Sequence, residues 1–172
     1  MFKAKRFSNR FTKWAFFLFS AALLYGMGYA AAGEAHFKYK GFVDGEATNA
    51  RADFSFMKSI NIWHLSLSSY DKTTRDNASV HIFFSKNFSP KAGTFPIAFS
   101  YLNKTDTCGG SFSFKKGDKR GLFSHDTKGE IIFETFNEKA KGSFRMDVFD
   151  RGGDKIEVSG SFELEMGDAF KK

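Results

Sequence analysis

The sequence has one cysteine, Cys108, and four histidines, and this scarcity excludes several classes of protein. A lone cysteine cannot form an internal disulfide, and a cysteine-based zinc finger needs several thiolates. The sequence also lacks the H-E-x-x-H, G-x-S-x-G, phosphate-loop, dinucleotide-binding and EF-hand patterns. With no local motif for catalysis or cofactor binding, we predict a protein that is not an enzyme and holds no cofactor.

The chain begins with a basic stretch that has no acidic residue, followed by an apolar stretch. Residues 1–13 hold five Lys and Arg side chains, residues 14–25 are largely apolar, and small residues follow as Ala30-Ala31-Ala32-Gly33. This order is typical of a secretory signal peptide. We predict a helical signal peptide over residues 1–32, cleaved near Ala32 and Gly33, and a location in the periplasm or outside the cell. Without cleavage, this segment would be the chain's membrane contact.

The formal charge of +7 belongs mostly to this first segment. Residues 33–172 carry 21 basic and 19 acidic side chains, a net charge of +2. Phosphate backbones are bound by a concentrated basic surface. The remaining basic cluster, residues 115–120, is interpreted as a solvated hairpin turn. We therefore predict no nucleic-acid partner.

Residues 33–172 alternate between apolar and polar side chains, which is typical of half-buried strands. The alternation is clearest in residues 155–166 and 141–149, and the glycines of residues 150–154 predict a tight hairpin between them. Further strands are expected at residues 36–43, 50–57, 60–70, 78–85, 95–102, 111–114, 120–125 and 129–136. We predict a single all-β domain, an antiparallel β-sandwich or a small β-barrel.

Phenylalanine is abundant, with 24 residues, and 18 of them follow Gly33. Large rigid rings at inward positions pack well on a pleated sheet, which indicates a Phe-rich core. The same rings could instead line a cavity for an apolar small molecule. An outer-membrane barrel is a further alternative, although several expected strands are short for one.

Few residues are candidates for chemistry. His64 and His81 lie on neighbouring expected strands, but a loop centred within residues 71–77 need not place them on one face, and a metal site needs convergent ligands. They are weak metal candidates, and we predict no metal site. Cys108 is expected in a turn, inert or unpaired, with His125 the nearest histidine downstream.

Half of the chain carries a faint pattern of short motifs. Phe88-Ser89-Pro90-Lys91-Ala92-Gly93-Thr94-Phe95 precedes Gly129-Glu130-Ile131, and two G-S-F strands begin at Gly142 and Gly160. Over residues 88–166 the chain resembles small exported bacterial domains of unknown function. The resemblance implies an antiparallel β-sandwich and no established activity. Many such proteins are lipoproteins, and this chain has no cysteine near its expected cleavage site.

These observations favour an exported, non-enzymatic β domain that binds or scaffolds a partner, either a protein or an apolar ligand. The alternatives are a carrier with a Phe-lined barrel and a small outer-membrane barrel. The sequence does not define the partner, the oligomeric state, the state of Cys108, whether the interior is filled, or whether the signal segment is retained.

Overall fold

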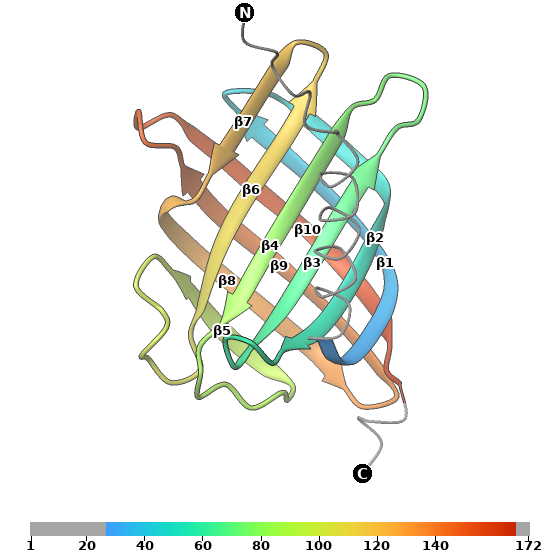
Figure 1. Cartoon of the computed structure of the whole chain (residues 1–172), viewed down its shortest axis with the longest axis vertical. Helices are drawn as coiled ribbons and strands as arrows, with labels where there is room; N and C mark the ends of the chain where they lie inside the picture. Colours follow the sequence, from blue (N-terminus) through green and yellow to red (C-terminus); the bar gives the residue numbers. More distant parts are fainter. Residues whose placement is uncertain (1–26, 168–172) are drawn as a thin grey trace, which may run out of the picture.

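The computed structural model describes residues 27–167, with side chains from Ala31 onward, and this part of the chain is all β (Figure 1). The expected all-β class is therefore confirmed. The ten strands are β1 (Met27–Gly41), β2 (Gly45–Met57), β3 (Ile62–Tyr70), β4 (Asn77–Phe84), β5 (Gly93–Ala98), β6 (Cys108–Lys116), β7 (Lys119–Phe123), β8 (His125–Phe136), β9 (Lys139–Phe149) and β10 (Lys155–Glu165).

Nine of the strands close into a barrel, which decides between the two predicted architectures. The order runs β4-β3-β2-β1-β10-β9-β8-β5-β6, and β6 pairs back with β4. Neighbouring strands are antiparallel except β5 and β6, which meet in parallel through Ile97 and Cys108. Strand β7 extends the sheet as a hairpin with β6. The sandwich alternative is wrong because the β4–β6 ladder, from Asn77 opposite Lys115 to Phe84 opposite Cys108, joins the two sides.

The predicted hairpin between β9 and β10 is confirmed. Asp150 and Asp154 close the loop through a backbone hydrogen bond of 3.0 Å, and Gly153 adopts a positive φ of 91°. The inward positions of β10 are buried as the alternation predicts, with Ile156, Val158 and Leu164 at most 1% exposed. The period-two pattern thus identifies both the strand and its inner face.

Aromatic rings fill the inside of the barrel. The rings of Phe54, Phe84 and Phe133, from three strands, lie with their centroids 5.8 to 6.0 Å apart. Phe133 also packs against Phe95 and Phe136. An apolar ligand at this level would have to displace these rings, so this layer is a packed core. The Phe-rich core is confirmed by these buried rings.

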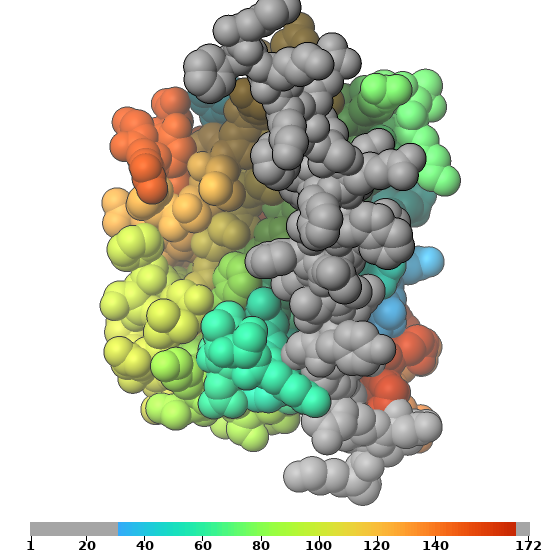
Figure 2. All heavy atoms as spheres, viewed as in Figure 1, coloured from blue at the N-terminus to red at the C-terminus, as the bar shows by residue number. Residues whose placement is uncertain are grey.

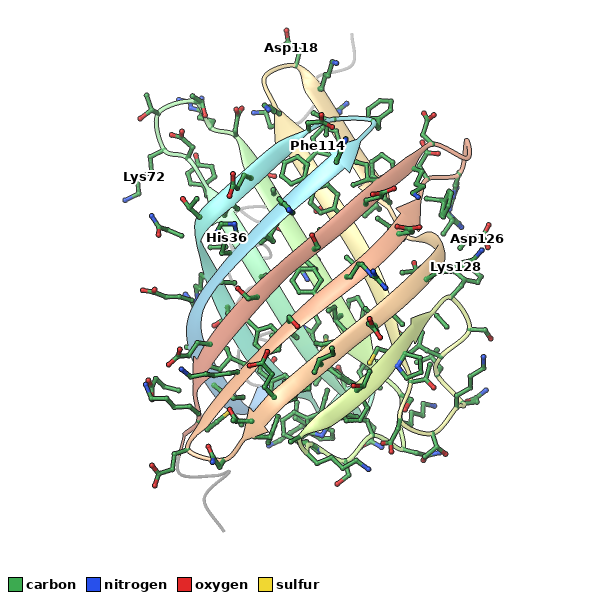
Figure 3. All side chains as sticks on the ribbon, turned by 180° about the vertical axis from the view of Figure 1, so that it is seen from behind. His36, Lys72, Phe114, Asp118, Asp126 and Lys128 are labelled. Atoms are coloured by element: carbon green, nitrogen blue, oxygen red, sulfur yellow. The ribbon has the colours of Figure 1, made fainter. Side chains whose placement is uncertain are left out.

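A second aromatic layer lies nearer the β6–β7 hairpin. Phe112 packs against Tyr39 at 4.9 Å, and Phe114 packs against Phe123 at 6.2 Å. Figure 3 labels Phe114 at this end. The hairpin is tied to the rest of the rim by Lys116, whose ammonium donates to the carbonyl of Asp44 at 2.7 Å.

The outer wall formed by β8, β9, β10 and β1 is charged, as the stick view from behind shows (Figure 3). Lys139 and Lys141 both bind Glu163, at 3.1 and 2.9 Å, and Lys155 binds Asp147 at 3.0 Å. Transmembrane barrels present the opposite arrangement, with apolar side chains outward. This wall therefore differs from the lipid-facing surface of such barrels.

The predicted signal segment lies mostly outside the described residues, since residues 1–26 are not described. Residues 27–32 belong to strand β1, where a helix was expected. The predicted cleavage site, Ala32 and Gly33, lies inside this strand, paired with Asp53 and Ala52 of β2. Among residues 27–167 there is no helix with the length and apolar character needed to cross a bilayer.

Candidate functional site

The outer wall on the side of β3, β4 and β6 carries no formal charge along its middle, in contrast to the wall described above, and Lys115 and Lys116 lie at the end of β6 beside the β6–β7 hairpin. The outward side chains of this middle part, which we call the serine–histidine wall, are all half-buried. They are His64, Ser66, Ser68, Ser79, His81, Phe83, Ser111 and Ser113. The register aligns them in rows, with Ser66 beside His81 and Ser111, and Ser68 beside Ser79 and Ser113.

The two histidines of this wall contact each other. His64 Nε2 lies 3.1 Å from His81 Nδ1, a hydrogen-bond distance in which one nitrogen donates and the other accepts. Their rings are nearly parallel, at 13°, and Phe83 stacks on His64 with a centroid distance of 4.6 Å. The position of both imidazoles is therefore defined by a hydrogen bond and an aromatic contact.

Burial holds both imidazoles in their neutral form. It lowers the pKa of His64 to about 4, an effect that the nearby His81 strengthens and the carboxylate of Asp53 opposes. Burial also lowers the pKa of His81. Both effects follow from the cost of placing a charge where water is partly excluded. At neutral pH the pair presents uncharged nitrogen donors and acceptors.

The register that joins the histidines differs by one residue from the one considered in the sequence. Asn77 belongs to β4 and pairs with Tyr70, so the loop spans residues 71–76. His64 then lies opposite Phe83, and because Phe83 is two residues after His81, the two histidines are on the same face of the sheet. A loop centred on Thr74 would have put the histidines on opposite faces, because a one-residue slip reverses the outward set.

An apolar groove of about 620 Å³ adjoins the wall at one end of the barrel. We call it the end groove, and its lining residues are Ser59, Ile60, Asn61, Ile62, Phe83, Lys86, Tyr101 and Leu102. The β2–β3 turn and the loop after β5 form its two sides, and their atoms lie together at the lower end of the molecule in Figure 2. Ile60 and Leu102 are 48% and 45% exposed, so both rims of the groove are apolar and accessible.

The loop after β5 is anchored where it borders this groove. The amide of Lys86 donates to the carbonyl of Leu102 at 3.4 Å, and that of Ser85 donates to the carbonyl of Thr107 at 2.9 Å. Gly109 leaves space for the ring of Tyr101, which a Cβ atom at this position would meet. Residues 99–102 therefore form a rim of the groove that these contacts fix in place. The strand predicted to run to Leu102 ends at Ala98.

The other candidates do not form a reactive group. Cys108 begins β6, where a turn was expected, and its side chain is fully buried and free. Burial, with a smaller contribution from Asp106, raises the pKa of its thiol well above the usual range. His125 packs its ring against Phe99 at 6.0 Å. The geometry thus provides no activated thiolate at Cys108.

The acidic loop of residues 71–76 and the basic hairpin of residues 115–120 are held in place by local hydrogen bonds. Asp71 Oδ1 accepts hydrogen bonds from the amides of Thr73 and Thr74, and Asp76 Oδ1 accepts one from the amide of Gly117. Residues 115–120 form the β6–β7 hairpin, as interpreted from the sequence. Within residues 27–167, no three His, Cys, Asp or Glu side chains gather in a group that could hold a metal.

Comparison of the chain with protein-family models, with curated proteins and with solved structures finds no match. The sequence does not predict the end groove, because Ile60 and Leu102 fall at the ends of the expected strands 60–70 and 95–102, whereas both lie in loops. Asn61 lies in the β2–β3 turn with a positive φ of 56°, a conformation that asparagine tolerates. Its asparagine side chain is the sequence signal that could have indicated the turn in which Ile60 is exposed.

Proposed function

We propose that this chain is an exported, non-enzymatic β-barrel that binds a protein partner through the end groove and the adjoining serine–histidine wall. The observation that carries the proposal is the asymmetry of the outer surface. One side is covered with charged pairs such as Lys155–Asp147, whereas the other has an uncharged middle that leads into an apolar groove. Docking surfaces of proteins are depleted in charge at their centre and apolar where they are buried.

The shape of the groove favours a protein segment over a small molecule. Small-ligand pockets enclose most of their ligand, whereas here Ile60 and Leu102 remain about half exposed on opposite rims. A larger partner can cover both rims at once. The lining holds one charged side chain, Lys86, and no carboxylate. The groove is therefore suited to an apolar segment flanked by an acidic residue.

Export is supported by the basic start, the apolar segment and the small residues that end at Gly33. The carrier alternative would require an apolar ligand within the barrel, where the rings of Phe54, Phe84 and Phe133 now meet. We therefore place the binding surface outside the barrel. The absence of catalysis is part of the proposal, and it is supported by the buried, protonated state of Cys108.

The anionic apolar dye 1-anilinonaphthalene-8-sulfonate tests whether the groove accepts apolar groups. We expect enhanced dye fluorescence with the wild-type protein and a loss of at least fivefold in Ile60→Glu and Leu102→Glu. Leu122→Glu is the matched control, because Leu122 is 64% exposed on β7, a strand that does not line the groove. Equal fluorescence in all four proteins would contradict the assignment of the groove.

The partner is tested by site-specific photo-crosslinking in the producing cell. A photoreactive residue at position 102 should give one discrete protein adduct, and the same residue at position 122 should give none. Lys86→Glu should weaken the adduct at position 102 because it reverses the charge in the groove. Identical adducts at both positions would show unspecific contact. Fractionation and the intact mass of the released protein test export and cleavage.

A further inference from the structure

We propose that His64 and His81 together bind one divalent transition-metal ion, of the kind that imidazole nitrogens prefer, on the outside of the barrel. Copper and zinc are the leading candidates because neutral imidazole is among their usual ligands. The site would have two protein ligands, and water would complete the coordination. The proposal rests on the placement of the two rings and is independent of the partner assigned to the end groove.

The distance between the two nitrogens fits a shared metal ion. Zinc binds histidine nitrogen at about 2.0–2.1 Å with tetrahedral angles, so two ligand nitrogens on one ion lie about 3.3 Å apart. His64 Nε2 and His81 Nδ1 are already 3.1 Å apart. Each ring must turn so that its lone pair points toward the ion, and the nitrogens need to separate by only a small fraction of an ångström.

The backbone and an aromatic ring prepare this geometry. The histidines lie on adjacent antiparallel strands, and Phe83, paired with His64 in the β3–β4 ladder, stacks on its ring. Rigid strands position ligands better than loops do, and prepositioned side chains lose less conformational freedom when they bind. Two cross-strand histidines can therefore act as a bidentate ligand.

The wall around the pair holds little formal charge. Burial disfavours a positive charge at His64, and the carboxylate of Asp53 on β2 opposes this effect. Asp53 is itself held by Arg51, at 2.7 Å. The outward neighbours of His81 across the strands are Ser66 and Ser111, which carry no positive charge. A metal ion at the pair would thus meet little electrostatic repulsion on its own wall.

Binding of a metal ion to the two histidines requires a proton to move within one imidazole ring. In the hydrogen-bonded pair one of the facing nitrogens carries a hydrogen, and that hydrogen must move to the other nitrogen of the same ring before the metal binds. This is a change of tautomer, with no net release of a proton from a neutral imidazole.

The test is titration of the purified chain, without a histidine tag, with Zn²⁺ and with Cu²⁺. We expect one ion per chain in calorimetry and nitrogen hyperfine coupling from two imidazoles in the Cu²⁺ electron paramagnetic resonance spectrum. His64→Gln and His81→Gln should each weaken binding at least tenfold. His36→Gln is the matched control, because His36 is also an outward histidine and pairs with Glu46 on another wall (Figure 3). It should change the affinity less than twofold.

A second measurement does not depend on the folding of any variant. Substoichiometric Cu²⁺ should broaden the backbone amide signals around His64 and His81 in the wild-type protein and leave those of β9 sharp. The proposal is overturned if the chain binds less than one tenth of an equivalent of either ion. Equal binding by the His64→Gln, His81→Gln and wild-type chains, or broadening centred on another wall, would overturn it as well.

Discussion

Ala31 on β1 lies directly opposite Phe54 on β2, and both side chains are buried inside the barrel, at 1% and 0% exposure. The predicted cleavage site, directly after this pair, therefore lies within the β1–β2 ladder. A cut after Ala32 would remove the first part of β1, from Met27 to Ala32, which pairs with residues 53–57 of β2. The remainder, Gly33–Gly41, keeps nine of the ten pairs with β10 and loses the pair of Ala32 with Glu165, so the barrel would stay closed.

We predict that a chain beginning at Gly33 folds but is less stable than one beginning at Met27. It loses the buried methyl group of Ala31, five residue pairs with β2, one pair with β10, and part of the cover over Phe54. These losses correspond to about 2–4 kcal/mol of unfolding free energy. Urea unfolding of chains that begin at Met27, Ala31 and Gly33 measures the effect. Identical midpoints for all three would show that this end of β1 adds no stability.

Phe133 packs against rings from several strands of the core, and its removal should destabilise the barrel strongly. Its ring meets Phe54 at 6.0 Å and Phe162 at 5.3 Å, and its side chain is 1% exposed. We expect Phe133→Ala to lower the free energy of unfolding by about 3–5 kcal/mol. Leu122→Ala, at an exposed position, should change it by less than about 0.5 kcal/mol. A small loss for Phe133→Ala would show that the interior is loosely packed.

Strands with strict alternation could be predicted from the sequence, because an apolar residue indicates the inner face of the sheet and a polar residue the outer face. In β10 the buried residues Ile156, Val158 and Leu164 alternate with outward Glu157 and Glu163. In β1 the sequence predicts a strand only from His36, because residues 27–33 are small or apolar without alternation and share the composition of an export signal. Strand β5 was overextended because Phe99 and Leu102 are apolar and yet exposed.

Closure of the barrel and the histidine pair depend on register, which local patterns specify poorly. Val80 pairs with Phe112, 32 positions further along the chain, and no turn between them predicts this contact. The meeting of His64 and His81 depends on whether Asn77 lies in the loop or in β4. A difference of one residue moves a side chain to the other face. The end groove likewise requires two loops that are distant in sequence.

Cys108 should resist thiol reagents in the folded protein. Its side chain is fully buried and its thiol pKa is raised, so the reactive thiolate is scarce at pH 8. We expect reaction with Ellman's reagent at least a hundredfold slower in the native protein than in 6 M guanidinium chloride. A Ser161→Cys variant supplies an exposed thiol on β10 as the control. Fast native labelling of Cys108, or a disulfide-linked dimer on a non-reducing gel, would contradict this prediction.

The histidine pair should make the folded protein sensitive to acid. The pKa of His64 falls from 6.5 in the unfolded chain to about 4 in the folded one, mainly through burial. The unfolded chain therefore binds the proton more tightly, and protonation favours unfolding. The stabilising contribution is complete above about pH 6.5 and is lost as the pH falls toward about 4. The change in pKa corresponds to about 3 kcal/mol of unfolding free energy.

Urea unfolding of the wild-type protein and of His64→Gln, measured between pH 7.5 and 4, isolates this contribution. The wild-type midpoint should fall more steeply than that of His64→Gln across the interval, because only the wild type carries the buried imidazole at position 64. Ser68→Ala, on the same strand and the same wall, removes no titrating group and should follow the wild-type slope. Parallel curves for wild type and His64→Gln would mean that His64 takes up its proton equally well in both states. In that case the pair would be more open to water than its half-buried position on β3 and β4 implies.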